Sequence, residues 1–106
     1  MPIVARGLVN QKRIATAVRK AERLLRADVK RIMFSIEPDW IEEESLFFRI
    51  ILSDPASAPA RLYKTTRRIE LTIQKEIKAD ELGLQTYFSF RSESEQAEMR
   101  DPAWDA

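Results

Sequence analysis

The spacing of apolar residues changes along the chain, from a helical period near the N-terminus to an alternating one further on. Over residues 10–28, apolar side chains recur three and four residues apart, as on a helix with one buried face. Asn10 stands where an N-cap is expected. We therefore predict a first helix over 10–28, whose buried face carries Ile14, Ala17, Val18, Ala21, Leu24 and Leu25.

Two segments with a period of two residues follow this helix. Residues 31–37 send Ile32, Phe34 and Ile36 to one side of a sheet. Residues 46–53 are apolar on both sides, so we predict that they form the central strand. The polar loop "PDWIEEES" joins the two strands.

A second helix and a last strand complete the pattern. The segment "SDPASAP" predicts a break, after which Ser57 is the expected N-cap and Pro59 lies in the first helical turn. Gly83 is the expected C-terminal cap, and residues 86–91 alternate like a strand. The buried stripe of this helix is predicted to be Leu62, Thr66, Ile69, Ile73 and Ile77.

The predicted order of elements is α-β-β-α-β. Two amphipathic helices can cover only one face of a three-stranded sheet, so we predict a two-layer α+β fold. A chain of 106 residues has room for one such domain. We place it at residues 1–92 and treat 93–106 as an acidic C-terminal tail, irregular or loosely attached. An extra strand from residues 2–5 would make the fold ferredoxin-like.

The sheet face away from the helices is expected to carry apolar, aromatic and arginine side chains together. Such a face suits a second copy of the chain or another protein, and some RNA-binding modules stack bases on one. A third arrangement has the tail folding over this face with Trp104 as a plug. We favour a protein contact, made by Met33, Phe47, Arg49, Ile51, Tyr87, Arg91 and Trp104.

Charge alternates along the chain although the net charge is only +1. Residues 1–31 hold nine basic and two acidic side chains, and residues 61–78 hold six and two. Each basic block contains one predicted helix, and cations on a helix face can neutralise nucleic-acid phosphates. Leu71 is expected among the cations of the second helix, as in a contact with an acidic protein surface. The nucleic-acid alternative uses Arg19, Arg23, Arg26, Lys30, Lys64, Arg67, Arg68 and Lys75.

The chemistry available to this chain is narrow. It has no cysteine and no histidine, so thiolate nucleophiles, disulfides and the commonest transition-metal ligands are excluded. No catalytic motif is present, and the acidic run at residues 42–44 lacks the spacing of a calcium loop. We therefore expect no enzyme activity, cofactor or metal. The absence of cysteine and of long apolar runs favours a cytoplasmic protein that spans no membrane.

The element order resembles that of type II KH RNA-binding domains, which run α-β-β-α-α-β. This likeness implies RNA binding as a function to consider. The chain departs from the family where its G-x-x-G loop would stand. The segment "DPASAPA" occupies roughly that place, and the only glycines are Gly7 and Gly83. The resemblance therefore identifies no site residue.

The only two tryptophans lie in similar tetrapeptides, "EPDW" at 37–40 and "DPAW" at 101–104. For Trp40 we predict a proline turn in which the indole pins the loop to the domain. Trp104 is either a clasp for the tail or a ligand for a basic groove, such as the helix face of another copy.

The sequence as a whole predicts a small, non-enzymatic cytoplasmic binding module. Protein–protein interaction or self-association, as in a dimer, through the open sheet face and the tail is the preferred function. Nucleic-acid binding through the basic helix faces is the alternative. The sequence does not identify the partner.

Overall fold

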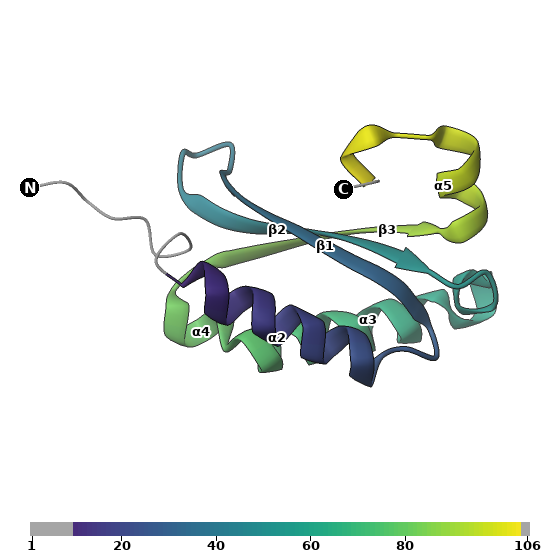
Figure 1. Ribbon diagram of the computed structural model, residues 1–106, viewed down its shortest axis with the longest axis horizontal. Coiled ribbons are helices and arrows are strands. Elements are labelled where there is room, and N and C mark those ends of the chain that lie inside the picture. Colours follow the sequence, from purple (N-terminus) through teal and green to yellow (C-terminus); the bar gives the residue numbers. More distant parts are fainter. Residues whose placement is uncertain (1–9, 105–106) are drawn as a thin grey trace, which may run out of the picture.

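The computed structural model describes residues 10–104, with elements labelled as in Figure 1. The strands are β1 (Val29–Pro38), β2 (Glu44–Leu52) and β3 (Gln85–Ser92). The α-helices in this part of the chain are α2 (Gln11–Leu24), α3 (Pro59–Ile77), α4 (Ala79–Leu82) and α5 (Glu93–Met99). Two short 3₁₀ turns are η1 (Pro55–Ser57) and η2 (Pro102–Trp104).

The three strands form one mixed sheet in the order β1-β2-β3. The central position of β2 confirms what its two apolar faces predict. β1 and β2 are antiparallel and joined by a short loop, whereas β2 and β3 are parallel and need the long crossover through α3.

Both long helices lie on one side of this sheet, which confirms the two-layer α+β fold (Figure 1). The helices α2 and α3 run antiparallel. Lys20 of α2 pairs with Glu76 of α3, and Arg13 of α2 pairs with Glu81 of α4, both at 3.2 Å. Between the layers lies the core, whose fully buried large side chains include Ile14, Leu46, Phe48, Ile50, Leu52, Ile69, Ile73 and Ile77.

The first helix is shorter than predicted, because it ends at Leu24 and not at residue 28. Leu24, predicted to be buried, is 59% exposed, while Leu25 enters the core. Lys30, predicted for a helix face, lies in β1 instead. The helical period cannot show where the chain leaves the helix, and here the turn is set by a contact that is distant in sequence.

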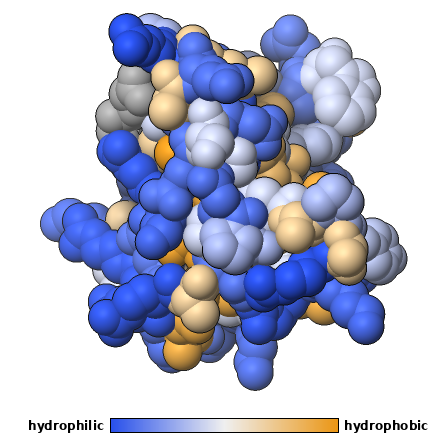
Figure 2. Space-filling view, turned by 90° about the vertical axis from the view of Figure 1, so that its right-hand side faces the viewer, coloured by the Kyte–Doolittle hydropathy of each residue, from blue (hydrophilic) through white to orange (hydrophobic). Residues whose placement is uncertain are grey.

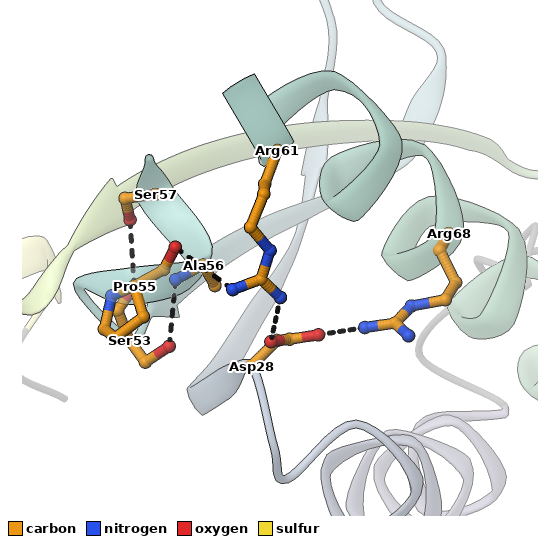
Figure 3. A network of polar contacts seen from close by, with 7 residues as sticks. All are labelled: Asp28, Ser53, Pro55, Ala56, Ser57, Arg61 and Arg68. Carbon is orange, nitrogen blue, oxygen red and sulfur yellow. Dashed lines mark hydrogen bonds and ion pairs between the residues drawn. The ribbon is translucent and has the colours of Figure 1, made fainter. Parts of the chain in front are cut away.

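That contact is a buried carboxylate, Asp28, which ties the turn to α3 (Figure 3). Its side chain accepts hydrogen bonds from Arg61 (3.2 Å) and from Arg68, and its carbonyl oxygen accepts the amide of Ser53 (2.8 Å). The Ser53 hydroxyl in turn accepts the amide of Ala56 in η1 (3.3 Å). The network joins the ends of α2 and β2 to the first half of α3.

α3 begins with Pro59 in its first turn, as predicted, but its N-cap is Ala58 and not Ser57. Leu62 is 39% exposed and Thr66 only half-buried, although both were predicted for the buried stripe. The buried residues of α3 are instead Thr65, Ile69, Ile73 and Ile77, which form a row with a spacing of four residues. Leu62 and Thr66 lie outside this row, beside β3.

The end of the second helical segment contains one more break than predicted. Lys78 adopts a left-handed conformation (φ 55°) and separates α3 from α4. Gly83 (φ 65°) then ends α4, which confirms its predicted role as a C-terminal cap.

The prediction of an irregular tail is wrong for residues 93–99, which form α5. Ser92 and Glu95 make a capping box: the Ser92 hydroxyl accepts the Glu95 amide, and the Glu95 carboxylate accepts the Ser92 amide, both at 3.1 Å. The predicted strand at residues 2–5 lies outside the described residues. Within residues 10–104, none of the helices has the length and apolar character needed to cross a membrane.

Candidate binding surfaces

The sheet face opposite α2 and α3, here called the open face, collects the sheet residues predicted for partner contact. Strand register sets them in rows across the sheet. From the hairpin end these rows are Ser35–Phe47–Tyr87, then Met33–Arg49–Ser89, then Arg31–Ile51–Arg91. Aromatic side chains therefore gather at the hairpin end and apolar and basic ones at the other end.

The C-terminal segment covers the second of these ends (Figure 1). Trp104 packs with Met33 and Ile51, and the three side chains are only 6%, 6% and 9% exposed. The Arg91 guanidinium lies 4.4 Å from the centroid of the indole ring, a cation–π contact. Four of the seven residues predicted for partner contact are thus used inside the chain.

Polar contacts hold this segment in place. Arg91 also donates to Gln96 (3.1 Å) and pairs with Asp101 (3.4 Å). Asp54, before η1, accepts the hydroxyl of Ser94 (2.6 Å) and its amide (3.1 Å), and these bonds lower the pKa of Asp54. At this end of the molecule the surface is mostly hydrophilic, with hydrophobic residues in small separate groups (Figure 2).

An aromatic platform made of Trp40, Phe47 and Tyr87 occupies the hairpin end of the open face. The Phe47 and Tyr87 rings are stacked at 5.0 Å, and Trp40 meets Tyr87 edge-on at 5.4 Å. Although it touches Tyr87, Trp40 is 78% exposed, and the neighbouring Ile41 is 59% exposed. Such large apolar side chains are unusual at full exposure on a monomer surface. The indole, predicted to pin its loop to the domain, contacts Tyr87 of the sheet, and most of its surface stays in solvent.

Asp39 is the buried anchor of the loop that carries Trp40. Its carboxylate accepts the amides of Ile41 and Glu43 (both 3.0 Å), the Tyr87 hydroxyl (3.2 Å) and the Ser45 hydroxyl (3.3 Å). Burial alone would raise the pKa of Asp39, but these four hydrogen bonds outweigh it and lower the pKa. The loop is thus fixed from below while the indole stays in solvent.

The tyrosine of the platform is held in its neutral form. Burial, the hydrogen bond to Asp39 and the charges of Asp39 and Glu43 all raise the pKa of Tyr87. Beside the platform, Arg49 donates to the Ser35 hydroxyl (3.2 Å), which itself donates to Glu37 (2.8 Å). A neutral phenol and a tied arginine suit a surface for contact better than one for proton transfer.

The opposite side of the molecule is basic. Within residues 10–104, seven of the eight cations predicted for nucleic-acid contact are exposed and make no ion pair, and Arg68 alone is paired, with Asp28. A hollow of about 360 Å³ beside α2 is lined partly by Arg19, Arg23, Arg26 and Lys30. A second hollow, of about 420 Å³, lies on the outer side of α3 and is lined by Tyr63, Lys64, Arg67, Arg68, Leu71, Thr72 and Lys75.

Sequence reasoning missed the two residues that organise the hairpin end. Asp39 is not among the predicted site residues, and Trp40 is predicted only to pin its loop. An aspartate directly after a proline is a turn signal, because its side chain can accept the backbone amide two residues on, and it would have pointed to the anchor. No local signal places Tyr87, 48 residues after Asp39, against the indole of Trp40.

Comparisons with known proteins identify no relative: no protein-family model matches the chain, and no curated protein or solved structure matches it significantly. The likeness to KH domains therefore remains one of element order. In the described part of the chain, no three acidic side chains are grouped so that they could hold a metal ion.

Proposed function

We propose that the protein is a non-enzymatic cytoplasmic binding module that contacts a protein partner through the aromatic platform and its loop. The observation that carries this proposal is that Trp40 is 78% exposed, yet held against Tyr87 by an anchored loop. Exposed apolar surface is unfavourable in water, and a rigid indole loses little entropy when a partner covers it. Buried tryptophans are also frequent among the residues that dominate protein interfaces.

The surroundings of the platform favour a protein over a nucleic acid. Residues 37–44 contain five acidic side chains and no basic one. Phosphates would be repelled there, whereas nucleic-acid binding relies on cations that neutralise them. An aromatic centre with a charged rim is the usual arrangement of a protein contact.

Site-specific photo-crosslinking in the cells that make the protein tests this proposal. A benzophenone amino acid replaces Ile41, next to the intact Trp40, and in a control chain it replaces Glu98, which is exposed on α5. We expect a protein adduct from position 41 that disappears with Trp40→Ala, and none from position 98. Equal adducts from both positions, or none from position 41, would refute the proposal.

Nucleic-acid binding by the basic helix faces is a second candidate, favoured by the seven predicted cations that make no ion pair within residues 10–104. Fluorescence anisotropy with single-stranded RNA and duplex DNA at about 50 mM salt tests it. Binding should weaken steeply as salt rises, because counterions are released. The Arg19→Glu/Arg23→Glu variant should bind less than wild type. Absence of binding at about 50 mM salt rules this candidate out.

A further inference from the structure

The outer side of α3 carries two exposed large apolar side chains among cations. Tyr63, Arg67 and Leu71 are four residues apart, so they lie in a row along the helix. Tyr63 is 79% and Leu71 50% exposed, and both line the 420 Å³ hollow. All the charged residues lining this hollow are basic, and three of them, Lys64, Arg67 and Lys75, make no ion pair within residues 10–104.

The Trp40 loop has the complementary chemistry. It presents Trp40 and Ile41 to solvent at its tip, and the exposed acidic residues Glu42 and Glu43 follow them directly. One surface is thus apolar with an acidic rim, and the other is apolar with a basic rim. Opposite charges of this kind steer association and fix its register.

We propose that the partner of the aromatic platform is a second copy of this chain, whose α3 hollow receives Trp40 and its acidic loop. This inference rests on the proposed function, since it names the partner of the same surface. The loop lies on the open-face side of the sheet and α3 on the other, so a chain cannot fill its own hollow (Figure 1).

The contact joins different surfaces of the two copies. In a two-fold dimer the loop of each copy enters the hollow of the other, whereas a single contact per pair leaves one loop and one hollow free and extends into chains or rings. A contact centred on two apolar side chains is small, and interfaces below about 1,200 Å² are weak or transient. We expect association that increases with protein concentration and decreases with salt.

Two variants with one defective surface each provide a direct test by sedimentation velocity. The loop variant is Trp40→Ala/Ile41→Ser, and the hollow variant is Arg67→Glu/Lys75→Glu. All four positions are exposed, so far-UV spectra and unfolding midpoints should match wild type. Each variant alone should associate about 30-fold more weakly, the change expected for hot-spot residues.

Mixing the two variants tests whether the loop of one copy enters the hollow of another. The hollow of the loop variant should receive the intact loop of the hollow variant, so the mixture should form one-to-one dimers and nothing larger. The charge-matched control Arg19→Glu/Arg23→Glu should still associate. A mixture that stays monomeric, or a control as defective as the hollow variant, overturns the inference.

Failure of this inference differs from failure of the proposed function. One outcome is that wild type is monomeric up to millimolar concentration while position 41 crosslinks to another protein. In that case the partner is not a second copy, and the aromatic platform remains the proposed contact surface. If wild type is monomeric and position 41 gives no protein adduct, both are wrong. Binding of the hollow to nucleic acid instead of the loop also overturns the inference.

Discussion

Residues 37–40 and 101–104 share an acidic residue, a proline and a tryptophan at matching positions, yet their indoles have opposite surroundings. Trp40 is 78% exposed and Trp104 is 6% exposed. In both segments an aspartate anchors the turn by accepting the amide two residues on, at 3.0 Å: Asp39 from Ile41, and Asp101 from Ala103.

The difference lies in the spacing between that aspartate and the tryptophan. Asp39 directly precedes Trp40. The side chain of Asp39 turns into the fold, and the side chain of Trp40 therefore points into solvent. Asp101 stands three residues before Trp104, and the 3₁₀ turn between them brings the indole back over the sheet. A likeness in residue type therefore predicts a turn in each case but not the side to which tryptophan points.

Removing Trp104 should have the largest effect on stability. Trp104→Ala should lower the free energy of unfolding by about 3 kcal/mol, because it leaves a cavity against Met33 and Ile51. Urea denaturation followed by far-UV circular dichroism measures this, and truncation after Arg100 should give a similar loss. A change below about 1 kcal/mol would mean that the tail is only loosely attached.

Replacing Arg91 should have a smaller effect at the same end. Arg91→Met keeps much of the side-chain volume but removes the cation–π contact with Trp104 and the ion pair with Asp101. We expect a loss of about 1 kcal/mol in the same denaturation experiment. Arg49→Met, on the same face but hydrogen-bonded to Ser35, is the matched comparison. If the two variants lose the same amount, Arg91 has no special part in holding Trp104.

Asp39 makes the hairpin end sensitive to acid. Because its folded pKa is lowered, Asp39 stabilises the fold above its unfolded pKa, and that contribution is lost as pH falls through the folded value. Wild type should have a higher unfolding midpoint than Asp39→Asn at about pH 6. This difference in midpoint should become smaller below about pH 4. The pKa of Asp54 is also lowered, by Ser94 at the other end of the molecule, so the difference for Asp54→Asn should change with pH in the same direction. A difference for Asp39→Asn that stays constant with pH contradicts this role of Asp39.

Trp40→Ala should have the smallest effect on folding. The indole only meets the edge of Tyr87, so we expect a loss below about 1 kcal/mol and an unchanged far-UV spectrum. The same variant should abolish the crosslink at position 41. A loss as large as that of Trp104→Ala would show that Trp40 is a folding residue and would remove the basis of the proposed contact.

Much of the fold was predictable because periodicity records burial directly. The alternation at residues 31–37 and 46–53 gave two strands and the central position of β2, and Gly83 gave a cap. The end of α2 was not predictable, because Asp28 closes that turn with arginines from α3. The capping box of α5 was present in the sequence and overlooked.

The candidate site was predictable only in part. Pairing of strands brings Phe47 and Tyr87 together, as their alternation indicates. Trp104 covers Met33 and Ile51 because the tail returns to the sheet. No local sequence pattern determines the path of that return. The exposure of Trp40 likewise depends on four hydrogen bonds to Asp39, one of them from β3.

Fluorine NMR of the protein labelled with 5-fluorotryptophan tests the contrast between the two indoles in one sample. Trp40→Phe assigns the two signals, and the change in shift between H₂O and D₂O reports the exposure of each ring. We predict a large solvent shift for Trp40 in dilute protein that shrinks as concentration rises, and a small, constant one for Trp104. A large solvent shift for Trp104, or one for Trp40 that persists at every concentration, would contradict the account.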